Sequence, residues 1–537
     1  MKSVCRGRSL LGLNIAAIAL ISLIFSTAEA AKSVKDRWDE FHSDPVRAMN
    51  SPPPKTLRPG KSKPVQVFSP QEATSRSFVE KKNRARLGDL NQPICDELGV
   101  CLRDIIEGRA AAKQNVSDFF DQTEFKNKKI ILKLDEMEAV NLKEAELDET
   151  PWSDTYWPIY QGLLGSRFGD GNFKRAGNWK GHYDFILNKS QSLKSIADSG
   201  SALALDLLSP SEKYDLLIGD LTEGRTVYEN GYLTPVMWEE GSLYWDRYSE
   251  VEAWMGICDG WAKASFRTPR PTKSIEVASA DGTKQLKFYP SDIKGLTSYM
   301  WAKSQSTPSR FIGGRCNDKE AKADPDTGRI TDEACFDTNP ANWHHIVVNQ
   351  IGVAKKSFVM DATFDYEVWN HPLTAYSYSY FNPATGETTD TLASAVIDVA
   401  SFKNDKFKKF RSKKTAYVVG INMVVTYVVE TEPSHSDTDG PEYDATSTAD
   451  YMYDLELDKD MNVIGGEWYT NLHPDFLWSP VADARPSSVG DSLVKGSWNA
   501  DEPLPKFWQD IAIRTALENK LPVFGIVEAL IEKSNRP

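Results

Sequence analysis

The sequence has little of what nucleic-acid-binding, repeat, membrane-spanning or calcium-binding proteins contain. The formal charge is −13 at pH 7, which argues against nucleic acid as the main partner because phosphate binding requires a basic face. There is no internal repeat, and no apolar run beyond the N-terminus is long enough to span a membrane. Acidic loops at 324–328 and 436–440 offer oxygens that suit calcium, but neither completes a calcium-binding loop. No cofactor is therefore expected to be required, and calcium is a possible ligand without a complete motif.

The N-terminus has the pattern of a secretory signal peptide over residues 1–30. Lys2, Arg6 and Arg8 form a basic start, residues 10–25 are mostly apolar, and Ala28 to Ala30 fits a small-x-small cleavage site. A membrane anchor is the alternative, but the apolar run is short for a span. We expect a mature chain that is secreted, or periplasmic in a bacterium, and that makes no membrane contact after cleavage.

Export changes the interpretation of the cysteines, of which there are only six. Cys5 leaves with the signal peptide, and an oxidising compartment favours disulfides between cysteines that are close together. The natural local pairs are Cys95 with Cys101 and Cys316 with Cys335. Cys258 is left over, as a buried spectator, an intermolecular linker or a nucleophile.

A length of 537 residues is too great for one hydrophobic core, so more than one domain is expected. Composition divides the remainder of the chain into four segments. These are a Pro-rich, basic and disordered leader or linker at 31–90, a helical N-terminal or pro-region at 91–150, the main domain at 151–480, and a C-terminal extension at 481–537 with a helix from Phe507 onward.

Helix signals precede strand signals in the main domain. Ser209 to Glu212 combines a serine cap, proline at the first helical position and glutamate three residues after the cap. Strand-forming runs follow at 346–351, 357–363 and 416–430, and a hairpin is predicted at 452–468. Helices followed by strands predict an α+β fold.

Cys258 lies in the segment 256–262, Gly-Ile-Cys-Asp-Gly-Trp-Ala, directly before a helix-compatible run. Amide dipoles at a helix start and a nearby imidazolium both favour the thiolate, which is the reactive form of cysteine. A nucleophilic cysteine also requires a base and a group that orients the base. Asp259 opposes thiolate formation unless its carboxylate points away.

Two of the seven histidines directly precede a predicted strand. His344 and His345 lead into the run at 346, and Asp361 lies in the next short strand, so imidazole and carboxylate can lie side by side. Because neighbouring strand residues face opposite sides, only one of the two histidines can meet Cys258. Each residue alone is more often structural, but the three in the order Cys, His, Asp favour a thiol active site.

Several longer motifs resemble the transglutaminase elicitor family, which comprises secreted enzymes of oomycetes with bacterial relatives. The resemblance covers roughly residues 150–480. It rests on segments 151–158, 208–215, 256–262, 343–344, 349–352, 357–372 and 465–478, which occur in the expected order.

The resemblance implies a papain-like or transglutaminase-like core that transfers the acyl group of a glutamine carboxamide to a lysine amine. Carried over to this chain, Cys258 is the nucleophile and Asp361 the carboxylate. The family's histidine follows an aromatic residue and precedes an Asn-Gln pair, which points to His344. The implied partners are proteins with accessible glutamine and lysine side chains. His371 stands where the family's elicitor peptide has glutamine, which argues against elicitor activity here.

Two other functions fit the same residues. A cysteine protease or amidase would use the same triad, because the same thioester intermediate serves hydrolysis and transfer. A non-enzymatic extracellular recognition protein would carry the triad in an inactive form, and the carboxylate of Asp259 beside the thiol is the feature that supports it.

Overall fold

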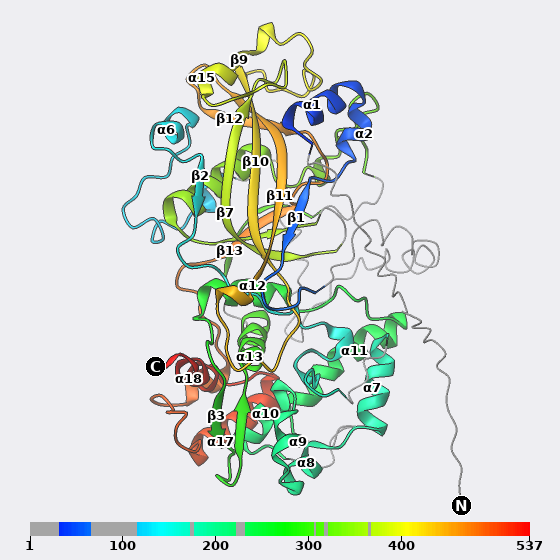
Figure 1. Cartoon of the computed structure of the whole chain (residues 1–537), viewed down its shortest axis with the longest axis vertical. Helices are drawn as coiled ribbons and strands as arrows, with labels where there is room; N and C mark the ends of the chain where they lie inside the picture. The colour runs from blue at the N-terminus through cyan, green and yellow to red at the C-terminus, as the bar shows by residue number, and fades with distance from the viewer. Residues whose placement is uncertain are drawn as a thin grey trace, which may run out of the picture.

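A computed structural model describes residues 32–65, 115–171, 177–221, 231–304, 308–315, 321–363 and 367–537. A sheet-containing half and a helical half form the upper and lower parts of Figure 1. This mixture of helices and strands confirms the α+β class. The predicted signal peptide lies outside the described residues. Within the described ranges, no helix has the length and apolar character needed to cross a bilayer.

One large sheet forms the upper half. Its main strand order is β1-β11-β10-β7-β6-β13-β5. Off this path, β12 pairs with β11, β9 with β10, and β2 and β8 with β7. The strands are β1 (Lys55–Arg58), β2 (Glu144–Glu146), β5 (Ser309–Gly313), β6 (Val359–Asp361), β7 (Asn370–Phe381), β8 (Thr388–Thr389), β9 (Ile397–Asp398), β10 (Tyr417–Val429), β11 (Ala445–Leu457), β12 (Val463–Trp468) and β13 (Phe476–Pro480). All of these described strands pair antiparallel.

The two longest strands, β10 and β11, form the centre of the sheet. Their register pairs Tyr417 with Leu457 at one end and Val429 with Ala445 at the other. β10 is rich in valine and tyrosine, which favour strands because their side chains pack well on a pleated surface. β10 confirms the strand predicted at 416–430, and β11 with β12 confirms the predicted hairpin.

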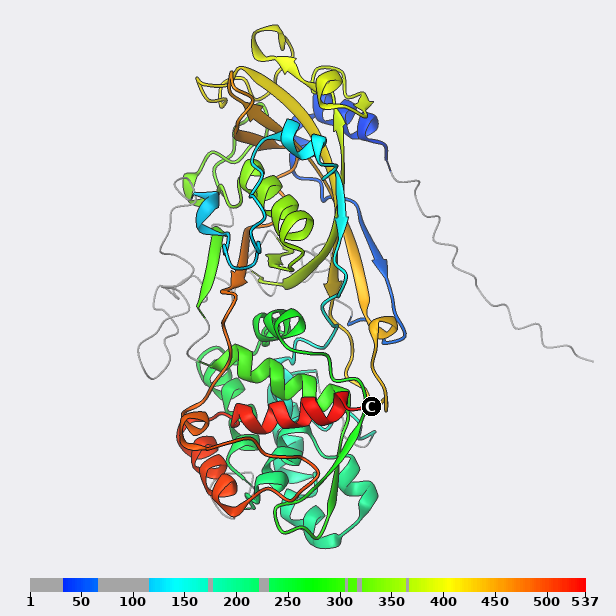
Figure 2. The same ribbon diagram turned by 90° about the vertical axis from the view of Figure 1, so that its left-hand side faces the viewer.

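Helix α14 (Pro340–Val347) and the π-helix η6 (Val348–Ala354) cover one face of the sheet, and both are yellow-green in Figure 2. Ile346 and Ile351 are fully buried and share one apolar core with Val419 of β10 and Leu455 of β11. Burial of this apolar area holds the two helices on the sheet.

The strand predicted at 346–351 is therefore wrong, because these residues are helical. Asn339 caps the helix start, since its side chain accepts a hydrogen bond from Ala341 N at 2.9 Å, and Pro340 occupies the first helical position. These start signals and the burial of the apolar run outweigh the strand preference of isoleucine and valine.

The lower half consists mainly of helices. They are α7 (Trp179–Asn188), α8 (Leu193–Ser199), α9 (Ala202–Asp206), α10 (Pro210–Ile218), α11 (Leu233–Tyr248), α13 (Pro290–Lys303), α16 (Val489–Leu493), α17 (Lys506–Asn519) and α18 (Phe524–Asn535), with the hairpin β3 (Ile275–Ala278) and β4 (Gln285–Phe288). Helix α10 begins as predicted, because Glu212 N donates to Ser209 Oγ at 3.3 Å and Ser209 N donates back to Glu212 at 3.0 Å. Helix α17 confirms the helix predicted near Phe507.

The residues expected as a C-terminal extension complete the helical core. Trp508, Ile526 and Leu530 are buried in the same cluster as Leu217 of α10 and Ile293 of α13. The lower half is therefore built from two stretches of chain that are distant in sequence, 151–304 and 481–537.

The described part of the predicted disordered leader is folded, which corrects that expectation for residues 32–65. It contains α1 (Val34–Ser43), α2 (Pro45–Met49) and β1. Phe41 and Met49 are buried with Phe381 and Tyr469 of the sheet half. The Pro-rich composition predicts disorder because the segment has few apolar residues, but these few are buried. Residues 66–90 lie outside the described ranges.

The predicted helical region at 91–150 is described from residue 115 onward, and there it is mostly irregular. It contains the 3₁₀ turn η2 (Val116–Asp118), the short helix α6 (Leu134–Ala139) and strand β2. Leu134 and Met137 are fully buried in the core beneath α14. The other short elements are η3 (Ile159–Gln161), η4 (Leu163–Gly165), η5 (Glu333–Cys335), α15 (Leu392–Ala395), η7 (Val399–Ser401) and η8 (Pro441–Tyr443).

Helix α12 (Cys258–Arg267) lies at the junction of the two halves, between the sheet above and α13 below (Figure 1). Gly260 allows this close approach, because a Cβ atom there would lie 2.2 Å from Ser298 O of α13. The junction therefore fixes the position of Cys258 at the start of α12.

We expect Lys213→Met to destabilise the helical half. Lys213 Nζ of α10 pairs with Asp292 Oδ2 of α13 at 2.6 Å, and both side chains are fully buried. The substitution leaves an unpaired buried carboxylate, so the free energy of unfolding should fall by ~3–5 kcal/mol. The midpoint of urea unfolding, followed by helical circular dichroism, measures the loss.

The matched control is Lys506→Met, which removes a pair at 2.9 Å whose side chains are 74% and 60% exposed. An exposed ion pair contributes little to stability, so the urea midpoint of Lys506→Met should stay close to that of the unmodified chain. Equal midpoints for the two variants would contradict the assigned role of the buried pair.

Candidate active site

Cys258 is the first residue of α12 and its side chain is buried. It is the free cysteine among the described residues. Gly256 allows the preceding turn to approach the chain closely, because a Cβ atom there would lie 2.3 Å from Tyr156 O. The predicted placement of the thiol at a helix start is confirmed.

The sulfur of Cys258 contacts the beginning of β7. Asn370 Nδ2 donates to Cys258 Sγ at 3.4 Å, and Sγ lies 3.7 Å from Val368 O. Trp478 Nε1 of β13 donates to Asn370 Oδ1 at 2.8 Å. The indole N–H therefore occupies the amide oxygen and directs the NH₂ group of Asn370 toward the sulfur.

Burial, together with the carboxylate of Asp259, raises the pKa of the Cys258 thiol to about 12, although the hydrogen bonds from Asn370 act to lower it. Asp259 is turned partly toward solvent, with 44% of its side chain exposed, and it pairs with Lys263 Nζ at 3.4 Å. Lys263 also lies 5.4 Å from the ring centre of Trp478. At neutral pH the thiol is therefore protonated in this arrangement.

Asp361 lies in β6, directly opposite Asn370 in the register with β7. Its Oδ1 accepts hydrogen bonds from Trp369 N at 3.0 Å and from Thr363 Oγ1 at 2.8 Å, while its buried Oδ2 has no hydrogen-bond partner. Burial raises the pKa of this carboxyl to about 7. The structure thus brings Asp361 next to the residue that contacts Cys258.

His344 lies on α14 and has no hydrogen bond, ion pair or ring contact with Cys258 or Asp361, all three of which are described. Its Nδ1 is 2.8 Å from Tyr453 Oη, its ring packs on Tyr378 of β7, and its buried Nε2 has no hydrogen-bond partner. Burial lowers the pKa of His344 well below its ordinary value, so the imidazole is neutral. The two members of the predicted triad that the structure brings near each other are Cys258 and Asp361.

His345, the alternative base, points elsewhere. Its Nε2 is 2.9 Å from Leu132 O, and burial lowers its pKa to about 4. The two histidines therefore face different surroundings, as expected of neighbours, although they do so on a helix and not on a strand.

A second buried pair near the thiol was not identified as a site from the sequence. His371 Nδ1 lies 2.9 Å from Val428 O and 3.8 Å from Glu430 Oε2. Burial raises the pKa of Glu430 to about 8, and neither of its carboxylate oxygens has a hydrogen-bond partner. His371 directly follows Asn370, and its ring lies 6.1 Å from that of Trp261 in α12.

Aromatic residues surround the thiol. Trp152, Tyr156, Trp261 and Trp369 are buried in one cluster with Cys258. Trp261 Nε1 donates to Trp152 O at 3.0 Å, so this ring is held within the core. The cluster explains why the thiol is buried and why its pKa is raised.

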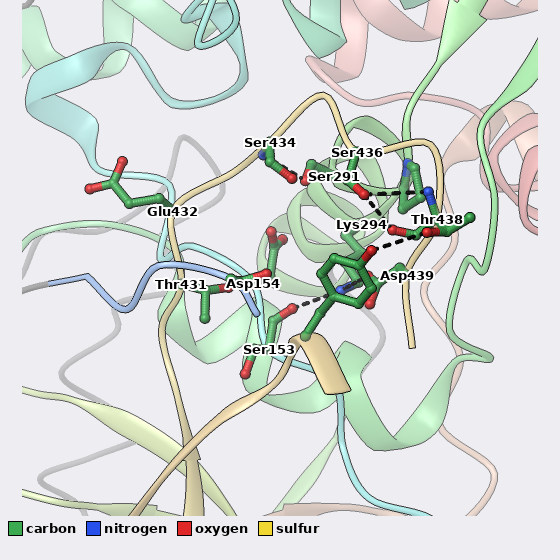
Figure 3. Close-up of a pocket in the computed structure, with 13 residues that line it drawn as sticks. Ser153, Asp154, Ser291, Lys294, Thr431, Glu432, Ser434, Ser436, Thr438 and Asp439 are labelled. Carbon is green, nitrogen blue, oxygen red and sulfur yellow. Dashed lines mark hydrogen bonds and ion pairs between the residues drawn. The ribbon is translucent and has the colours of Figure 1, made fainter. Parts of the chain in front are cut away.

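The acidic loops considered for calcium bind cationic side chains instead. Asp324 pairs with Lys409, and Asp439 pairs with Lys294 and Arg270. Among the residues that the structure describes, no group of three His, Cys, Asp or Glu side chains has metal-binding geometry. Figure 3 shows Lys294 and Asp439 beside a small polar cavity.

Three of the cysteines in the predicted disulfides, Cys95, Cys101 and Cys316, lie outside the described residues. Cys335 is buried near the start of α14. Both pairings therefore stay predictions.

Comparison with known proteins agrees with the motif-based resemblance. Residues 246–495 match the family described as Transglutaminase elicitor. The GP42 transglutaminase from Phytophthora sojae is a structural neighbour at 17% identity and a TM-score of 0.47, with 78% of this chain and 98% of that chain covered. No curated protein sequence matches the chain.

We expect Asn370→Leu to slow alkylation of Cys258 by iodoacetamide. The substitution keeps the side chain's approximate size but removes a hydrogen bond that lowers the thiol's pKa. A rise of one pKa unit reduces the thiolate about tenfold at fixed pH. Between pH 7 and pH 10, which is below this pKa, the ratio of the alkylation rates of the variant and the unmodified chain measures the shift in the pKa.

Trp478→Phe provides a graded comparison for this test. It retains an aromatic ring but removes the indole donor that orients Asn370, so a smaller slowing is expected. An unchanged rate profile in both variants would contradict the assigned role of Asn370.

Proposed function

We propose that the chain, which matches the transglutaminase elicitor family over residues 246–495, is a transglutaminase-type acyltransferase. The proposed substrates are proteins with accessible glutamine and lysine side chains. The observation that carries the proposal is the thiol of Cys258 at a helix start, in contact with the amide of Asn370. Export by residues 1–30 and independence of a cofactor are parts of the same proposal.

In the proposed reaction, Cys258 Sγ attacks the carboxamide carbon of a glutamine side chain. The carbon–nitrogen bond breaks, ammonia leaves with the proton taken from the thiol, and a thioester remains. A lysine amine then attacks the thioester and regenerates the thiol. Asn370 Nδ2 lies close enough to Sγ to donate to the oxyanion that forms on the same carbon.

We propose His344 as the base and Asp361 as its carboxylate partner. His344 Nε2 and Asp361 Oδ2 are both buried without a hydrogen-bond partner, so each atom can still form a hydrogen bond. Burial keeps His344 neutral and able to accept a proton. Because His344 does not contact Cys258 here, the proposal requires a rearrangement that brings them together.

A recognition protein without turnover is the second candidate function. The pKa of about 12 for Cys258 favours it, as does the absence of a histidine contact to this described thiol. The aromatic cluster and the buried carboxyls would then serve stability alone. Hydrolysis by the same thioester, as in a cysteine amidase or protease, is an outcome that the assay below detects.

We expect the purified mature chain to incorporate a labelled primary amine into a glutamine-containing protein, and Cys258→Ala to abolish incorporation. The reason is that the thioester requires the sulfur. Mass spectrometry of the acceptor protein measures incorporation. Ammonia release or cleavage without incorporation would indicate a hydrolase, and the absence of any Cys258-dependent reaction would favour the recognition protein.

His344→Gln and Asp361→Asn should each reduce transamidation at least about 100-fold, as expected for loss of general acid–base catalysis. Because the pKa of Asp361 is about 7, wild-type turnover should rise with pH through this value, and Asp361→Asn should lack that rise. Alkylation of Cys258 in each variant shows whether the thiol site is intact. Loss of turnover in His371→Gln but not in His344→Gln would reassign the base.

A further inference from the structure

An N-terminal segment follows the edge of the sheet toward the site of Cys258. This segment, Pro54–Val65, is called the strap below; β1 is its first part, the blue strand beside β11 in Figures 1 and 2. β1 pairs antiparallel with β11, from Lys55 opposite Ala449 to Arg58 opposite Thr446. The strap is thus an added edge strand that continues toward α12.

Backbone hydrogen bonds hold the strap, and few apolar contacts do. All four side chains of β1 are exposed. Beyond β1, Lys61 N donates to Glu442 O at 2.7 Å, and Val65 N donates to Glu430 O at 3.0 Å. Such bonds contribute only ~1 kcal/mol each, since water replaces them on release. The strap therefore has a specific position, but the free energy needed to detach it is small.

The end of the strap lies against the candidate active site. Val65 is half-buried and packs against the apolar cluster that contains Cys258. Its backbone partner, Glu430, has a fully buried carboxyl without a hydrogen-bond partner. Burial of a carboxyl without a hydrogen-bond partner is unfavourable. The arrangement with the strap in place therefore has an unfavourable free-energy contribution, which detachment of the strap would remove.

Two further contacts join the strap to the site. Lys55 Nζ donates to Ala362 O at 3.1 Å, directly after Asp361. Ser62 lines the small polar cavity of Figure 3, together with Ser153, Lys294 and Thr431, and this cavity measures about 20 Å³. The strap is therefore in contact with both sides of the junction that positions Cys258.

We propose that the strap covers the site of Cys258 in cis and occupies the edge of β11 where an extended polypeptide docks as an added strand. The docking part rests on the proposed function, with the extended polypeptide as the glutamine-bearing substrate. An open strand edge offers unpaired N–H and C=O groups to an incoming segment, and pairing with that edge would bring the segment to Cys258 as it now brings Val65. The substrate is thus an unfolded or extended segment, and the strap is its competitor.

Gly60→Ala tests the cover without altering the site itself. A Cβ atom at Gly60 would lie 2.1 Å from Asp444 O and 2.9 Å from Glu442 O, so the strap must shift away from this loop. We expect iodoacetamide to alkylate Cys258 about tenfold faster in Gly60→Ala, as the loss of one or two backbone hydrogen bonds predicts. An unchanged rate in the folded variant would overturn the proposal.

Gly465→Ala is the matched control. Gly465 lies on β12 in the same sheet. A Cβ atom added there would have its nearest neighbour, in the side chain of Glu456, at 3.8 Å, so the alkylation rate should not change. Circular dichroism establishes that both variants are folded. If Gly60→Ala does not fold, Val65→Ser weakens the same cover from its apolar end, and it must also accelerate alkylation.

A synthetic peptide with the sequence of residues 52–65 tests the docking part. Added to Gly60→Ala, it should restore slow alkylation of Cys258, while a scrambled peptide should not. Failure of protection would overturn docking at the edge of β11. Alkylation requires no turnover, so a chain that shows strap-dependent alkylation but no transamidation would separate failure of the proposed function from failure of this inference.

Discussion

The close approach of α12 to α13 at Gly260 is the constraint on which the rest of the site depends. A side chain at this position would overlap Ser298 O, so the two helices touch only because glycine has no Cβ. The approach of the two helices sets the position of Cys258 relative to β7. It therefore also sets the contact between the sulfur and Asn370. The sheet supplies Asn370 and Asp361 from adjacent strands, and the helical half supplies the thiol.

Desolvation dominates the electrostatics of this junction. It raises the pKa of Cys258, Asp361 and Glu430, and it lowers that of His344. Cys258, Glu430 and His344 are thereby mostly neutral at pH 7, whereas Asp361 titrates near that pH. The neutral forms reduce the penalty of burial, and the polar atoms that lack partners gain them once water or a polar substrate enters.

The sequence allowed prediction of those features that have local signals. The glycines around Cys258, the cap at Ser209 and the valine-rich run of β10 each specify their element through nearby residues. The run that follows His344 and His345 has the strand preference of Ile-Val-Val, and only its burial against the sheet shows that it is helical. Asn370, Trp478 and Glu430 have no local signal, since their contacts join residues about 60 to 110 positions apart, as Asn370 with Trp478 shows at 108.

The division of the helical half between 151–304 and 481–537 bears on the order of events during synthesis. Leu217 and Ile293 leave the ribosome long before Trp508, Ile526 and Leu530, the residues that complete their core. The whole sheet is therefore made while the first helices still expose apolar surface. Completion of the helical core is therefore a non-local step, and the apolar surface of the first helices stays open until the last helix is released.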